Sequence, residues 1–213
     1  MERQQHNQLV QHRFNSASET YDSMSAETLY AAPARISQRV DTIADAQARK
    51  TADLGCGTGL VGQMLKGRVG LLHGIDLSEN SLRVASGKTI YDELFLDEVE
   101  EFLKKNPDSY DLIVLGSVFL YFADLSGVLG LIARALRPGG HVIFTADRHD
   151  DPAIDVMRSP RGELMVIHSA DYVRRCVEGA GLQISHFENF VERLSWTSRD
   201  PVPALLVHAR SPG

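Results

Sequence analysis

Short apolar runs recur along the chain and alternate with stretches in which apolar residues return every three or four positions. Continuous apolar runs are typical of strands buried on both faces, and the longer spacing is typical of helices that bury one face. The pattern predicts an α/β fold, with a mostly parallel sheet covered by helices on both faces. Strands are expected at residues 51–54, 71–76, 93–96, 111–115 and 141–145.

The last part of the chain has a different pattern. Two apolar segments, residues 182–191 and 203–210, are separated by a polar loop too short for a crossover helix. They should therefore pair antiparallel, which gives seven strands with an antiparallel last strand. Residues 137–140, Arg-Pro-Gly-Gly, are expected to end the fourth helix in a turn. Residues 147–163, rich in Asp, Arg and Pro, are expected to form a mobile surface insertion.

Composition indicates one globular domain of 213 residues, of which 43% are hydrophobic and 23% charged. The formal net charge of −6 argues against a nucleic-acid partner. Cys56 and Cys176 have no zinc-type spacing, so no metal site is expected. The chain start lacks an apolar signal-peptide core, and the apolar run at residues 112–123 is short for a membrane span. We expect a cytoplasmic monomer or homodimer without membrane contact.

The clearest chemical motif is a glycine-rich turn after the first predicted strand. Its residues are Asp53, Gly55, Cys56, Gly57 and Gly59. Alternating glycines let a backbone pass close to a ligand and adopt the dihedral angles of a tight turn. Open parallel sheets bind ligands beyond these strand ends. There Asp53 could attract an ammonium group, and Asp76, which ends the second strand, could accept hydrogen bonds from both ribose hydroxyls.

A dinucleotide site is the alternative interpretation of this segment. Residues 57–62 fit the pattern G-x-G-x-x-G, and an acid follows at a suitable distance. However, Asp53 would place a negative charge beside a pyrophosphate. In the dinucleotide motif the third glycine packs the helix against the strand, and Gly62 lies too far along the chain for that position if the turn starts at Gly55. An NAD(P)-dependent oxidoreductase therefore stays the second enzyme class, behind a protein that binds a cationic, amino-acid-bearing ligand.

The segment from Asp53 to Gly59 resembles motif I of the class I S-adenosylmethionine-dependent methyltransferases. Residues 74–78 resemble the family's ribose-binding strand end, residues 110–114 its fourth strand, and residues 136–140 the turn before its fifth strand. The nearest subgroup is that of bacterial small-molecule methyltransferases (type 11/12-like, TPR-associated), although the chain has no TPR repeat. This resemblance implies a Rossmann-like methyltransferase domain at residues 47–213, preceded by a helical lid at residues 1–46.

The resemblance also implies S-adenosylmethionine as cofactor and S-adenosylhomocysteine as product. The glycine-rich turn would line the methionine end, Asp76 would hold the ribose, and Leu77 would lie beside the adenine. An acid before Val99 would bind the adenine amino group; the register favours Glu98 over Asp97, although both could simply cap a helix. The remaining positions that the resemblance assigns to the cofactor are Val99 beside these acids, Leu115 and Gly116 after the fourth strand, and Arg13 and Tyr21 in the lid. A capped surface helix with Tyr21 half-buried is the alternative for the lid.

The implied reaction is methyl transfer to oxygen or nitrogen of a small-molecule acceptor. Alignment of the nucleophile supplies much of the acceleration in such a displacement, and a protonated nucleophile also needs a general base. His168 and Tyr121 are the candidate catalytic residues, with His149 and Asp147 as further candidate bases. Ser117 stands where the subgroup usually has an acid, so it could bind substrate or only pack. The non-enzyme alternative is a cofactor-binding partner of another enzyme.

Overall fold

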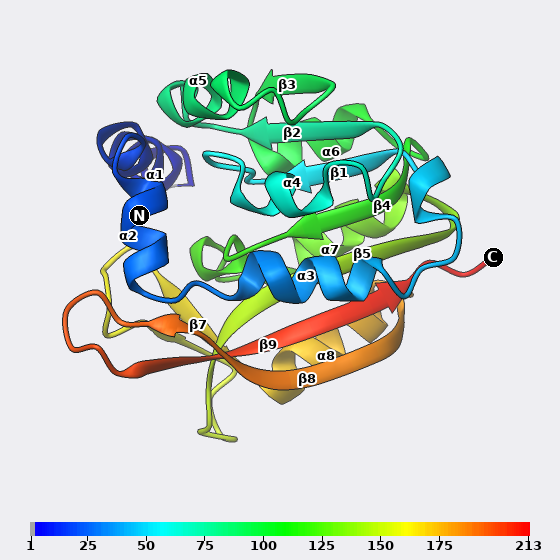
Figure 1. Ribbon diagram of the computed structural model, residues 1–213. Helices are drawn as coiled ribbons and strands as arrows, with labels where there is room; N and C mark the ends of the chain where they lie inside the picture. Colours follow the sequence, from blue (N-terminus) through cyan, green and yellow to red (C-terminus); the bar gives the residue numbers. More distant parts are fainter. Residues whose placement is uncertain (1–2) are drawn as a thin grey trace.

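The structure is a computed structural model that describes residues 3–213 (Figure 1). Seven strands form the main sheet in the order β3-β2-β1-β4-β5-β9-β8. Neighbours from β3 to β5 pair parallel, whereas β9 pairs antiparallel with both β5 and β8. The predicted α/β sheet with an antiparallel last strand is therefore confirmed. Its strands are β1 (Thr51–Leu54), β2 (Leu72–Asp76), β3 (Glu93–Leu96), β4 (Tyr110–Leu115), β5 (Leu136–His149), β8 (Gln183–Leu194) and β9 (Pro201–Arg210).

Two further strands, which the sequence pattern did not predict, lie beside the far end of β5. These are β6 (Val156–Arg158) and β7 (Val166–Ser169). The end of β5 pairs parallel with β7, and β7 pairs antiparallel with β6. The count of seven strands thus holds for the main sheet only. The segment predicted as an irregular insertion, residues 147–163, contains β6, and β7 follows it.

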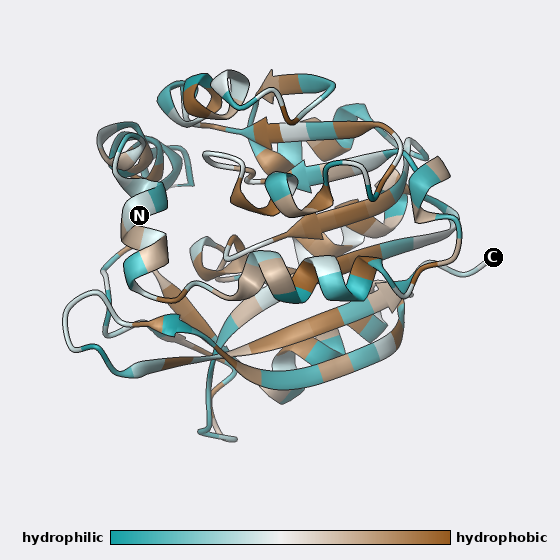
Figure 2. Cartoon of the chain, in the orientation of Figure 1, coloured by the Kyte–Doolittle hydropathy of each residue, from teal (hydrophilic) through white to brown (hydrophobic). Residues whose placement is uncertain are grey.

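Helices cover both faces of the sheet, as the sequence pattern predicts. The helices are α1 (Arg3–Ala17), α2 (Tyr21–Glu27), α3 (Ala32–Val40), α4 (Leu60–Leu65), α5 (Glu79–Gly87), α6 (Val99–Lys105), α7 (Leu125–Ala135) and α8 (Ala170–Gly179), with 3-10 turns at Ala46–Ala48 and Phe119–Tyr121. Apolar residues of α3 and α4 pack on one face, and those of α6, α7 and α8 pack on the other. The central strands β1, β2 and β4 are almost wholly buried between these layers, and β4 is the most hydrophobic of the three (Figure 2).

The expected turn at residues 137–140 is wrong. Helix α7 ends at Ala135, and β5 begins at the next residue. The physical reason is pairing with the end of the chain: the Gly139 amide donates to the Pro212 carbonyl (3.0 Å), and the Ser211 amide donates to the Gly140 carbonyl (2.8 Å). These bonds hold the segment extended, while Gly139 supplies a left-handed bend at φ +74°.

The segment before β1 has two structural roles. Helix α3 belongs to the core of the main sheet, since Ile36 and Val40 are fully buried against it. Helices α1 and α2 instead lie beyond the ends of β1, β2 and β4, toward which the arrowheads of these strands point (Figure 1). In the described part of the chain, no helix has the length and apolar character needed to cross a membrane.

Candidate active site

The glycine-rich turn joins β1 to α4 and forms the floor of a cavity. Gly55, Gly57 and Gly59 all adopt left-handed backbone angles, with φ of +67°, +54° and +92°. A side chain at Gly55 would collide with Val118, 2.5 Å away, whereas no atom lies within 4 Å of where a Cβ at Gly57 would be. The glycines therefore permit the turn and also leave open space above its centre.

Asp76 closes this turn from the end of β2. One carboxylate oxygen accepts a hydrogen bond from the Gly57 amide, and the other accepts from the Ser78 amide, both at 2.8 Å. Burial raises the pKa of Asp76, and these amide donors oppose that shift. Each oxygen retains a further lone pair, so this cavity-lining carboxylate can still accept hydrogen bonds from a ligand's hydroxyls.

Asp53 lies just behind the turn rather than on the cavity surface. Its carboxylate accepts a hydrogen bond from the Tyr91 hydroxyl at 2.7 Å, and the residue is only 1% exposed. Burial raises the pKa of Asp53 to about 7, although the Tyr91 hydroxyl counteracts this effect. The Tyr91 ring also packs against Gly62, where an added Cβ would lie 2.3 Å from its hydroxyl. Gly62 therefore makes room for Tyr91, which is not the helix-to-strand packing of a dinucleotide site.

Above the turn is a cavity of about 350 Å³, within the size range of small-molecule sites. It brings together most of the predicted cofactor residues. Those that line it are Tyr21, Gly55, Cys56, Gly57, Asp76, Leu77, Asp97, Glu98, Val99 and Gly116. Arg13, Asp53, Gly59 and Leu115 do not line it: Arg13 is exposed on α1, and Leu115 is fully buried in the core.

The two acids after β3 lie at the rim of this cavity. One Asp97 oxygen accepts from the Glu98 amide (3.0 Å), and the other accepts from the Lys105 ammonium (2.7 Å). Glu98 lies 4.0 Å from the Arg3 guanidinium, which also pairs with Glu100. Asp97 thus has partners within its own helix region, while Glu98 faces the first turn of α1.

Helices α1 and α2 form the roof of the cavity, and they are attached mainly by polar contacts. The Gln11 side chain donates to the Leu77 carbonyl (2.7 Å), and Asn15 accepts from the Ser78 hydroxyl (2.7 Å). Asp22 accepts from the Thr58 hydroxyl and pairs with the Lys88 ammonium. Val10 is the only buried residue of α1. The roof is therefore held to the region around β2 with little apolar burial.

The two candidate catalytic residues lie in different environments. Tyr121 lines the cavity and makes an edge-to-face contact with Phe14, with ring centroids 5.6 Å apart. Burial raises the pKa of its hydroxyl. His168 is fully buried on β7, outside the cavity lining, with Nε2 2.8 Å from the Phe122 carbonyl oxygen. Burial lowers its pKa, and its Nδ1 has no hydrogen-bond partner among the described residues.

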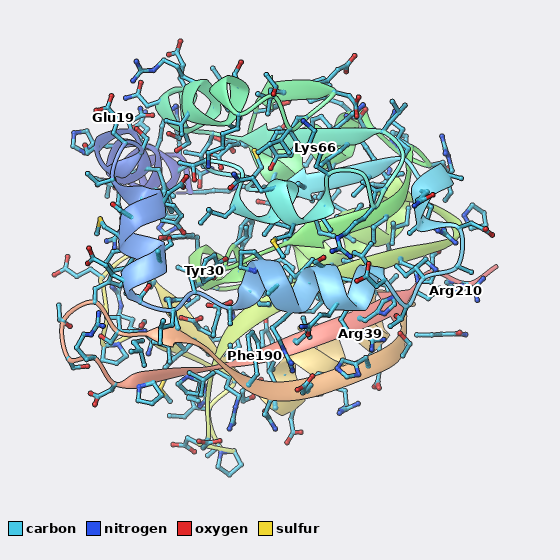
Figure 3. All side chains as sticks on the ribbon, viewed as in Figure 1. Glu19, Tyr30, Arg39, Lys66, Phe190 and Arg210 are labelled. Atoms are coloured by element: carbon cyan, nitrogen blue, oxygen red, sulfur yellow. The ribbon has the colours of Figure 1, made fainter. Side chains whose placement is uncertain are left out.

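The other residues considered as bases are also buried. Asp147 pairs with Arg161 and Arg193, and both ring nitrogens of His149 lack hydrogen-bond partners among the described residues. Sequence reasoning missed Tyr30, which lines the cavity from the connection between α2 and α3 (Figure 3). It also missed the Asp53–Tyr91 hydrogen bond. No motif marks either tyrosine's role, because tertiary packing alone brings them to the site.

Comparisons with known proteins agree with this geometry. Residues 52–144 match the methyltransferase domain family. The ubiquinone biosynthesis O-methyltransferase of Thiobacillus denitrificans is 29% identical over 140 residues, which cover 63% of this chain and 56% of that protein. Its counterpart from Klebsiella pneumoniae is 26% identical over 155 residues, covering 71% and 60%. The chain thus spans somewhat more than half the length of these relatives.

Among solved structures, an S-adenosylmethionine-dependent methyltransferase from Mesorhizobium loti has the same fold, with a TM-score of 0.66 at 21% identity. That match covers 84% of this chain and 98% of the other. The fold, the glycine-rich turn and the family match together support a class I S-adenosylmethionine-dependent methyltransferase.

The residues present fit the cofactor of this class. Gly57 leaves the open space that a closely approaching ligand needs, and Asp76 can accept from ribose hydroxyls. The carboxylates of Asp97 and Glu98 lie along the same cavity and suit an amino group. When bound, S-adenosylmethionine supplies an electrophilic methyl group on a sulfonium.

Proposed function

We propose that this protein transfers a methyl group from S-adenosylmethionine to oxygen or nitrogen of a small-molecule acceptor. The observation that carries the proposal is the cavity between the glycine-rich turn, Asp76 and the roof formed by α1 and α2. Its volume suits a cofactor and a small acceptor, and enclosure by the roof favours exclusion of water. The names of the curated relatives support an oxygen acceptor.

The protein chain's own contribution would be positioning. The Asp76 carboxylate and the glycine-rich turn would fix the cofactor, so that the acceptor atom approaches from one side only. Tyr121 is proposed to contact the acceptor, because it lines the cavity. His168 stays a candidate base, and its fully buried position would require a rearrangement to bring it to an acceptor.

Calorimetric titration with S-adenosylmethionine and S-adenosylhomocysteine tests the cofactor step. We expect Asp76→Asn to weaken binding about 10- to 100-fold, because hydrogen bonds to a charged group contribute about 1.5–3 kcal/mol. Asp171→Asn, in the exposed first turn of α8, serves as the matched control. Equal affinity in wild type and Asp76→Asn would show that the cofactor does not occupy this cavity.

The acceptor step needs a turnover assay, in which S-adenosylhomocysteine release is followed with a panel of phenols, catechols and amines. Cofactor binding without turnover across the panel, together with stable co-purification of another subunit, would favour a non-catalytic partner. We propose a cytoplasmic monomer or homodimer; two free, buried thiols are compatible with a reducing compartment.

A further inference from the structure

Three departures from regular backbone geometry converge beside the cavity, on the side of β4. Ser117, just after β4, has φ +55°, and Leu29, just before Tyr30, has φ +57°. In β8 the pairing with β9 shifts between Val191 and Arg193, so that Glu192 forms a β-bulge. Non-glycine residues with such angles cost free energy, and bulges are common next to active sites, where they redirect side chains.

The bulge places two consecutive charged side chains in the interior. Glu192 is 0% exposed and Arg193 is 9% exposed, although adjacent residues of a regular strand face opposite sides. The Glu192 carbonyl accepts a hydrogen bond from the Ala31 amide (2.7 Å), and the Leu194 amide donates to Thr28 (2.7 Å). The bulge is therefore tied to the connection that carries Tyr30 into the cavity.

Behind the cavity, these side chains form a buried ionic cluster. The Arg193 guanidinium donates to Asp147 (2.9 Å) and pairs with Glu192, while Arg161 donates to Asp147 (2.8 Å). The Thr145 hydroxyl donates to Glu192. Desolvation makes buried ion pairs poor contributors to stability, so their presence beside a cavity indicates a functional role.

The cluster reaches the cavity through Ser117. Arg193 donates to the Ser117 hydroxyl oxygen (3.3 Å), and the Ser117 amide donates to the Thr145 hydroxyl (2.9 Å). Ser117 and Tyr30 both line the cavity, and the Tyr30 hydroxyl lies against Gly116, 3.1 Å from where a Cβ would be. Because Arg193 occupies a lone pair of Ser117, the Ser117 hydroxyl hydrogen remains available for donation. We call Tyr30, Gly116 and Ser117 the β4 wall.

The charges behind the β4 wall favour an anion. The charged and titratable groups around it are the following: Arg161 and Arg193; Asp76, Asp147 and Glu192; and Tyr21, Tyr30 and Tyr121. Burial and Asp147 raise the pKa of Glu192 to about 7, against the opposing effect of Arg193. The two guanidiniums therefore stand beside a carboxyl group, Glu192, whose charged form is disfavoured by burial.

We propose that the β4 wall binds the acceptor oxygen as an oxyanion. The hydroxyls of Tyr30 and Ser117 donate hydrogen bonds to this oxyanion, and Arg193 is a positioning residue behind them. The inference rests on the proposed function and specifies its acceptor as a hydroxyl acidic enough to ionise, such as a phenol or catechol. The hydroxyl loses its proton to solvent on binding. Its oxygen then bonds to the methyl carbon as the carbon–sulfur bond breaks, and that electron pair stays on sulfur.

The test uses 4-nitrocatechol, whose ionisation changes its visible absorbance, added to the full-length protein saturated with S-adenosylhomocysteine. We expect the pKa of the bound probe to be at least about one unit lower than that of the free probe. Such a shift means that the ionised probe binds about tenfold more tightly than the neutral probe. Ser117→Ala and Tyr30→Phe should each remove most of this shift. Matched controls are Ser37→Ala on α3 and Tyr110→Phe, whose hydroxyl contacts His73 at the other end of β4.

The outcomes separate this inference from the proposed function. Calorimetry measures S-adenosylhomocysteine binding for every variant. If the wild-type protein does not bind S-adenosylhomocysteine, the proposed function itself is overturned. If S-adenosylhomocysteine binds but 4-nitrocatechol does not, or ionises no more readily than in water, the oxyanion site is refuted. A downward shift that survives in both Ser117→Ala and Tyr30→Phe would equally refute the role of the β4 wall.

Discussion

Replacing Asp53 with asparagine should stabilise the cofactor-free protein at alkaline pH. Asp53 is fully enclosed at the end of β1, and its one side-chain partner is the Tyr91 hydroxyl. No cationic side chain is paired with it among the described residues. The ionised carboxylate is thus a desolvated charge without a counter-ion, a condition that favours the protonated form.

The magnitude follows from the shift in pKa. Burial raises the pKa of Asp53 from 3.8 to about 7, so the folded protein holds this proton more tightly than the unfolded chain. The stability that this provides is fully present below the unfolded pKa and is lost as the pH rises through the folded pKa. With about 1.4 kcal/mol per pKa unit, the loss between pH 5.5 and pH 8 is about 2 kcal/mol.

The assay is urea unfolding of wild type and Asp53→Asn at pH 5.5 and pH 8, without cofactor. Asparagine cannot ionise, so the stability of the variant relative to wild type should increase by about 2 kcal/mol between the two pH values. Asp171→Asn, an exposed substitution on α8, should show no such increase. An Asp53→Asn difference that is the same at both pH values would refute the reasoning, whatever its absolute size.

Two further predictions concern the turn and the roof. Gly62→Ala should destabilise the protein by about 1–3 kcal/mol in urea unfolding, because the new methyl group would displace Tyr91. The control Gly130→Ala, with open space around it, should not destabilise the protein. Equal effects of the two substitutions would contradict the packing of Tyr91 on Gly62. Asp22→Ala should weaken S-adenosylhomocysteine binding about tenfold by calorimetry, since it removes the Thr58 contact that holds the roof; unchanged affinity would show that the roof does not cover the bound cofactor.

The parallel half of the fold is predictable because burial on both faces leaves a direct trace in the sequence. Tyr110–Leu115 is an apolar run interrupted by Asp111 alone, and the structure buries nearly all of it. Val156–Arg158 leaves no such trace, since it is a short, partly exposed strand. The extended start of β5 was missed for another reason: its hydrogen-bond partners are in the last residues of the chain, which no local pattern reveals.

Within the site, the residues near β1 and β2 are predictable and those near β4 and β8 are not. Gly57 and Asp76 lie 19 positions apart in a fixed strand–turn–helix arrangement, so spacing alone brings them together. Glu192 and Arg193 look like surface residues of an exposed strand, because a bulge cannot be recognised from composition. Tyr30 reaches the cavity only because the backbone of that bulge holds its segment in place.

The carboxylates around the cavity indicate why the site is built at the expense of stability. Burial raises the pKa of Asp53 and of Asp76, so both charges are disfavoured in the folded chain. A ligand that brings a sulfonium and an ammonium group into the cavity beside these two carboxylates would offset part of this cost, whereas a dianionic pyrophosphate would increase it. The same desolvation that makes the empty site unfavourable therefore selects a cationic cofactor, and it does so before any acceptor is bound.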